Sequence, residues 1–159
     1  MKETDFITRL NLKFNKNKLL KEFKELEFKS HFSSPNIKNN WLRATLTKQF
    51  NNFPNIKKLH NKFEGTKIFA FILKPYTDVH YHIDPMTLCA INIILSENYG
   101  PVKFKEYGEI YYKQALFNNN RMHSIPAFEE ERLLLMFPYF NKSYEDVKNS
   151  LSDSLLLEN

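Results

Sequence analysis

The residues best suited to chemistry in this chain are three potential metal ligands, His82, Asp84 and His123, and one arginine, Arg132. His82 and Asp84 are two residues apart in the run Val79 to Asp84, which has the composition of a β-strand. On a strand this spacing directs both side chains to the same face. A histidine and an aspartate that converge there can bind a divalent metal ion, and His123 is the only later histidine available as a third ligand.

Two histidines and one carboxylate form the facial triad typical of non-haem Fe(II) oxygenases, in which the opposite side of the metal stays open. Arg132 follows His123 by nine residues and would share a strand face with Leu134 and Met136. A buried arginine is costly unless it pairs with a carboxylate, and its planar fork binds one through two parallel bonds. Arg132 is therefore predicted to anchor an anionic co-substrate. The alternative is a salt bridge with the run Glu129 to Glu131.

Asn92 lies between apolar neighbours in the middle of a predicted strand, where a buried amide must find hydrogen-bond partners. We expect it to face the cavity and contact co-substrate or substrate, with a purely structural amide as the alternative. His80 and His82 also form an HxH pair, which permits a cupin-like metal site, although no glutamate follows within a few residues. His80 is better interpreted as facing the substrate or supporting a ligand, and His31 and His60 as surface histidines.

These residues need a rigid β scaffold, and the sequence predicts one. Seven short strands are expected, at 67–73, 79–84, 89–95, 102–107, 109–117, 121–125 and 131–137. Before them, 18–29 has its apolar residues at helical spacing, and 42–53 repeats Leu42, Leu46, Phe50 and Phe53 in the same way until Pro54. Ser143 suits the start of a last helix. This pattern predicts a β sandwich or barrel with helical support.

Composition narrows the function classes. The 159 residues carry a net charge of +5, divided into +10 over residues 1–75 and −5 over 76–159. The basic half permits a nucleic-acid or other anionic partner, although a lysine-rich solvated surface is the simpler explanation and the favoured one. Three glycines exclude glycine-rich phosphate loops, and a single cysteine excludes an internal disulfide and favours the cytoplasm. The sequence contains no apolar run of membrane-spanning length and no signal-peptide pattern at its start.

The order His82-x-Asp84, His123, Arg132 resembles the Fe(II)- and 2-oxoglutarate-dependent oxygenase superfamily. The resemblance covers roughly residues 66–139 and is strongest with small phage and bacterial members. Among the branches, it is nearest to the aspartyl/asparaginyl β-hydroxylase-like and prolyl-hydroxylase-like ones. The animal aspartyl hydroxylases lack the metal-binding aspartate, so Asp84 departs from that branch.

The resemblance implies a double-stranded β-helix, or jelly roll, in one domain spanning residues 1–159, with a helical buttress at 1–63, a core at 66–139 and a helical tail at 143–159. It implies Fe(II) at His82, Asp84 and His123, and 2-oxoglutarate held by Arg132 with Asn92 nearby. Tyr76, Tyr81, Tyr111 and Tyr112 are candidates for a phenol bond to its distal carboxylate.

The resemblance further implies hydroxylation of an amino-acid side chain, free or peptidyl, with release of succinate and CO2. Two alternatives stay open at this point. One is a cupin-like metal-binding protein without 2-oxoglutarate chemistry, and the other is an oxygenase that acts on a nucleic acid, which is permitted but not favoured. A membrane partner is not expected.

Overall fold

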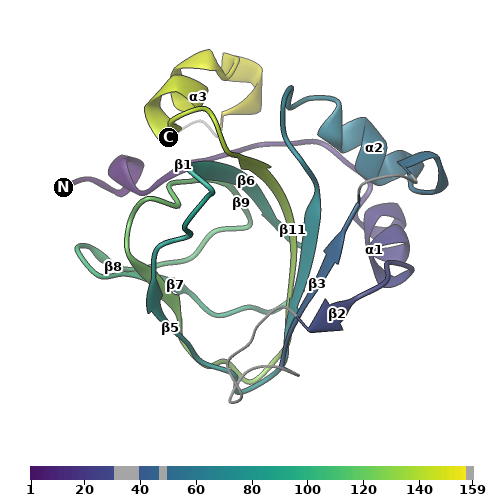
Figure 1. Ribbon diagram of the computed structural model, residues 1–159. Coiled ribbons are helices and arrows are strands. Elements are labelled where there is room, and N and C mark those ends of the chain that lie inside the picture. The colour runs from purple at the N-terminus through teal and green to yellow at the C-terminus, as the bar shows by residue number, and fades with distance from the viewer. Residues whose placement is uncertain (31–39, 47–49, 157–159) are drawn as a thin grey trace.

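The computed structural model describes residues 1–30, 40–46 and 50–156, and within them two antiparallel sheets face each other (Figure 1). The larger sheet has seven strands in the order β1-β9-β6-β11-β4-β3-β2, and the smaller has four in the order β5-β10-β7-β8. The strands of the larger sheet are β1 Ile7–Arg9, β9 Gln114–Phe117, β6 Cys89–Ile94, β11 Arg132–Tyr139, β4 Phe69–Leu73, β3 Trp41–Thr45 and β2 Lys29–Ser30. Those of the smaller sheet are β5 Val79–His82, β10 His123–Ile125, β7 Val102–Phe104 and β8 Gly108–Ile110. The prediction of a mainly β fold, a double-stranded β-helix with N-terminal helices, is confirmed.

Strands β6 and β11 form the middle of the larger sheet and are apolar on both faces, because helices cover one face and the smaller sheet covers the other. The outer face packs against α1 (Lys16–Lys24), α2 (Pro54–His60) and α3 (Tyr144–Ser150) through the largest buried cluster. The inner face carries Asn92, Arg132, Leu134 and Met136, which therefore point between the two sheets. Polar side chains on this inner face are the ones that can meet a site.

The prediction of a helix over 42–53 is wrong. Residues Trp41–Thr45 form strand β3, which pairs along its length with β4, and α2 begins at Pro54 instead of ending there. Proline suits the first turn of a helix, where its missing N–H is not needed. Within residues 1–63, the described part consequently contains three strands of the larger sheet as well as α1, α2 and two short 3-10 helices, η1 (Glu3–Asp5) and η2 (Phe50–Asn52). A third, η3 (Asp153–Leu155), follows α3.

The predicted strand 109–117 is likewise divided. Its first part belongs to β8 in the smaller sheet and its second part is β9 in the larger sheet, so the chain crosses between the sheets at residues 111–113. The other predicted strands are present within a few residues of their expected bounds. No helix in the described part of the chain is both long enough and apolar enough to cross a membrane.

Helix α2 is held by a distant carboxylate. Its N-cap residue Phe53 makes no capping bond, but buried Glu22 on α1 accepts hydrogen bonds from the backbone N–H groups of Asn55 (2.8 Å) and Ile56 (2.9 Å). The Asn55 side chain donates a further bond to the same carboxylate. Glu22 therefore satisfies N–H groups that a helix start leaves unpaired.

Replacing Glu22 by alanine is expected to lower the free energy of unfolding by about 2 kcal/mol, because two backbone donors lose a charged acceptor in a buried position. The measurement is the urea midpoint at constant slope. Exposed Glu25→Ala, at the C-cap of the same helix, is the matched control and should leave the midpoint within error. An equal midpoint for both variants would contradict this role of Glu22.

Candidate metal centre and anion pocket

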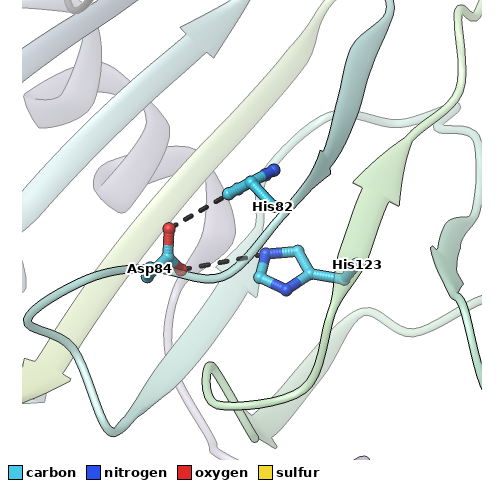
Figure 2. A group of neighbouring side chains, drawn as sticks. All are labelled: His82, Asp84 and His123. Carbon is cyan, nitrogen blue, oxygen red and sulfur yellow. Dashed lines mark ion pairs between the residues drawn. The ribbon is translucent and has the colours of Figure 1, made fainter.

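Three side chains converge at the edge where β5 and β10 pair. His82 and His123 lie directly opposite each other in this antiparallel pair, which places both rings on one face with their centroids 4.4 Å apart. Asp84 follows β5 and turns its carboxylate toward both rings (Figure 2). Its oxygens lie 3.5 Å from Nε2 of His82 and 3.8 Å from Nε2 of His123.

The hydrogen bonds of the two histidines leave the inward nitrogens free to bind a metal. Nδ1 of His82 lies 2.8 Å from the His80 carbonyl, and Nδ1 of His123 lies 2.8 Å from the Arg121 carbonyl. A carbonyl oxygen only accepts, so each Nδ1 must carry a proton, and Nε2 is the nitrogen of each ring that faces Asp84 and could bind a metal. This is the arrangement in which proteins orient histidine ligands.

The ligand atoms of His82, Asp84 and His123 all lie within 4.8 Å of one another, and the residues described contain this cluster of potential metal ligands. Two imidazole nitrogens and one carboxylate oxygen are a donor set that suits Fe(II). The residues present therefore fit a divalent metal of this kind. His123 is buried against Phe117 and Phe104, so one side of the cluster is closed by aromatic rings.

The electrostatics of the cluster favour an ionised carboxylate. Burial by itself raises the pKa of Asp84, but hydrogen bonds from His82 and Asn119 and the charge of the histidines outweigh it and lower the pKa. Burial lowers the pKa of His123, which keeps this ring neutral. Burial also acts to lower the pKa of His82, but its bonds to Asp84 and the His80 carbonyl raise it overall. A negative carboxylate beside a neutral imidazole is ready to bind a cation.

Asn119 is a member of this site that the sequence analysis did not identify. Its side-chain N–H donates to Oδ2 of Asp84 at 2.5 Å, and the residue is almost fully buried. The Asn119 Oδ1 atom has no hydrogen-bond partner among the described residues. A buried amide that is satisfied on one side only is retained at a cost, which is consistent with a role in holding Asp84.

Replacing Asn119 by alanine is expected to weaken Mn(II) binding by about 10- to 100-fold, because Asp84 loses the bond that orients it. Mn(II) is used because it resists oxidation in air, and the measurement is a calorimetric titration. The neighbouring exposed Asn120→Ala is the matched control. Unchanged Mn(II) affinity in Asn119→Ala would show that Asp84 needs no such support.

Arg132 lies at the start of β11, buried on the inner face, as its shared face with Leu134 and Met136 led us to expect. Its Nη2 donates to the carbonyl of Gly100 and, at 3.0 Å, to the carbonyl of Pro101. No carboxylate of the described residues forms an ion pair with Arg132, and Glu131 instead lies 4.0 Å from Lys74. Arg132 is thus a buried cation whose described partners are neutral.

Three further polar side chains, Asn92, Tyr99 and Tyr112, are linked to Arg132 directly or through Tyr112. The side chain of buried Asn92 donates to the hydroxyl of Tyr112 at 3.2 Å, and Asn92 Oδ1 has no partner among the described residues. Burial raises the pKa of Tyr112, so its hydroxyl keeps a proton to donate. Tyr99, which the sequence analysis missed, and Tyr112 both lie close enough to Arg132 to interact with its charge. These groups could together receive a carboxylate.

The remaining candidates lie elsewhere. Tyr76, Tyr81 and Tyr111 are exposed, so Tyr112 is the one predicted tyrosine beside Arg132. The side chain of His80 is 95% exposed and pairs with Asp78 at 3.2 Å, so the HxH arrangement of a cupin site is not formed. His60 was interpreted as a surface residue but is half-buried, with Nε2 donating to the Thr66 carbonyl at 2.9 Å. His31 lies outside the described residues.

Comparison with known proteins gives a match in structure only. No known family profile matches the sequence, and no curated protein matches it. A prolyl hydroxylase of Trichoplax adhaerens, in complex with a peptide fragment of the hypoxia inducible factor oxygen degradation domain, superposes with a TM-score of 0.65 at 13% identity, covering 86% of this chain and 82% of that one.

Two other solved structures are similar. The viral collagen prolyl hydroxylase of Paramecium bursaria Chlorella virus-1, a 2-oxoglutarate complex, has a TM-score of 0.58 at 11% identity over 84% of this chain and 94% of its own. HygX of Streptomyces hygroscopicus, with nickel and 2-oxoglutarate bound, has a TM-score of 0.57 at 11% identity over 80% and 79%. The chain therefore has the jelly-roll fold of the 2-oxoglutarate and Fe(II) oxygenases, and the resemblance noted in the sequence is confirmed at the level of the fold.

Proposed function

We propose that this chain, which has the fold of the 2-oxoglutarate and Fe(II) oxygenases, is an Fe(II)- and 2-oxoglutarate-dependent dioxygenase. It hydroxylates an amino-acid side chain, free or peptidyl, and releases succinate and CO2. The observation that carries the proposal is a pair of features, one contributed by each sheet. One is the cluster of His82, Asp84 and His123, and the other is the buried guanidinium of Arg132 without a carboxylate partner. Similar solved structures hold 2-oxoglutarate, and this supports the choice of co-substrate.

Each residue has a defined part in holding the reactants. Nε2 of His82, Nε2 of His123 and a carboxylate oxygen of Asp84 would bind Fe(II), with the two Nδ1–H groups fixed by backbone carbonyls. Arg132 would pair with the distal carboxylate of 2-oxoglutarate, and Tyr112 would donate to it. When bound, Fe(II) and 2-oxoglutarate supply the oxidising power, coupling loss of CO2 from the 2-oxo acid to transfer of oxygen from O2.

Other residues control the surroundings. Phe104 and Phe117 cover His123 and keep water from that side of the site. Asp84 supplies one negative charge and the histidines none, so a divalent metal here keeps a net positive charge that favours an anionic co-substrate. One similar solved structure holds a peptide, which supports a peptidyl substrate, and another holds hygromycin B, so the fold also receives small molecules.

The test is anaerobic addition of Fe(II) and 2-oxoglutarate to the purified chain. We expect a weak visible charge-transfer band, followed after exposure to O2 by succinate formation. The band requires metal and 2-oxo acid to meet at one site, which a metal-binding cupin-like protein has no need to provide. A folded wild-type protein that shows neither band nor succinate would exclude the proposal.

A further inference from the structure

A row of aromatic side chains begins beside the metal ligands with Trp41 on β3 and continues over β4 of the larger sheet. The ring of Trp41 lies 6.2 Å from that of His82, and the ring of Phe71 lies 6.1 Å from that of Trp41. Phe69 follows 6.2 Å from Phe71, and Phe140 lies 6.4 Å from Phe69. We call Trp41, Phe69, Phe71 and Phe140 the aromatic wall. The wall meets the triad at His82, whereas Phe104 and Phe117 meet it at His123.

Arg43 lies at the outer part of this wall. It pairs with Phe71 across β3 and β4, and it is two residues from Trp41, so all three side chains share the inner face. The spacing puts Arg43 about 7 Å from Trp41 along the strand. Its guanidinium lies over the Phe69 ring, 5.3 Å from the centroid, and the residue is exposed. The ring contact orients the guanidinium while leaving its N–H groups to solvent.

The charge at the wall is not compensated. No carboxylate of the described residues forms an ion pair with Arg43 or with Lys67, whose ammonium lies 5.4 Å from the centroid of the Phe140 ring. By contrast, the guanidinium groups of Arg9 and Arg121 are paired with Glu3 and Glu106. A substrate that lies along the wall therefore meets positive charge at the end remote from the metal ligands.

We infer that the substrate is an amino acid or peptide with a carboxylate that Arg43 binds while its apolar part lies on the aromatic wall. The inference rests on the proposed function, since it names the substrate class of the same site. A guanidinium fork matches the two oxygens of a carboxylate. Arg43 lies on an inner strand between Lys29 of β2 and Phe71 of β4, so the backbone there is engaged in the sheet. A phosphate site usually draws on free backbone N–H groups, which this position does not offer.

Trp41 is the only tryptophan of the chain, so its emission reports on the wall directly. The full chain, without metal, is titrated with two pools of acetylated, amidated octapeptides. Both pools are degenerate over residues other than Asp, Glu, Trp and Tyr except at one fixed position, which is glutamate in one pool and glutamine in the other. We expect half-saturation with the glutamate pool at a concentration about 5- to 10-fold lower. Arg43→Gln should remove this difference, and Arg9→Gln is the control that should keep it.

Three outcomes would each overturn the inference. They are equal half-saturation for the two pools, no emission change with either pool, and a glutamate preference that survives in Arg43→Gln. Tighter binding of octathymidylate than of the glutamate pool would also overturn it and would favour a nucleic acid. The charge-transfer band with Fe(II) and 2-oxoglutarate is recorded in parallel and should persist in Arg43→Gln. Because the titration needs no metal, a missing band in wild type would remove the proposed function without affecting the peptide preference.

Discussion

Replacement of Asp84 by alanine is expected to weaken Mn(II) binding by more than about 100-fold and to abolish succinate formation. Asp84 is the only anionic member of the cluster, and its two oxygens face Nε2 of His82 at 3.5 Å and Nε2 of His123 at 3.8 Å. Without it, the cation meets two neutral imidazoles and loses its charge partner. The loss exceeds that expected for Asn119→Ala, because a ligand is removed and not its support.

The measurement combines a calorimetric Mn(II) titration with the rate of 2-oxoglutarate turnover in the absence of substrate. Asp78→Ala is the matched control, because Asp78 also pairs with a histidine on the same strand but does so in solvent. It should bind Mn(II) as wild type does. Wild-type affinity in Asp84→Ala would mean that the metal, if any, binds elsewhere.

The sequence predicts those parts of the fold in which burial is continuous along a strand. Runs such as 89–95 and 133–137 are largely apolar at successive positions because they lie in the middle of a covered sheet, and this is visible locally. Segment 42–53 shows the opposite case. Its apolar spacing suits a helix, but Trp41–Thr45 becomes a strand because β4 offers a pairing edge, and such a long-range partner leaves no local signal.

The same distinction applies to the site. The His82 and Asp84 pair could be recognised because a period of two puts both on one face. The position of His123 opposite His82 depends on strand register. The sequence analysis selected His123 as a ligand only by its residue type and through the resemblance. Asn119 stands in a run of three asparagines, and such residues ordinarily form loops, so the sequence does not mark it as part of a site. Tyr99 approaches Arg132 only through the turn after β6, so no spacing in the sequence could indicate it.

Replacing Arg132 by methionine is expected to raise the concentration of 2-oxoglutarate needed for half-maximal turnover by at least about 30-fold, because losing one member of a buried, hydrogen-bonded charge pair costs about 2–5 kcal/mol. Arg132→Lys should fall between this variant and wild type, since an ammonium keeps the charge but not the fork. Turnover at saturating 2-oxoglutarate should fall much less, because the contact is made equally before and during reaction.

The bonds from Arg132 to the carbonyls of Gly100 and Pro101 raise the possibility that the residue serves only the fold. A comparison of co-substrates separates these roles. 2-Oxovalerate lacks the distal carboxylate, so the wild-type protein should strongly prefer 2-oxoglutarate to it, and Arg132→Met should lose this preference while binding 2-oxovalerate as wild type does. Arg9→Met, at the edge of the same sheet, should keep the wild-type preference. A folded Arg132→Met that still discriminates between the two acids would place the anchor of the distal carboxylate at another residue.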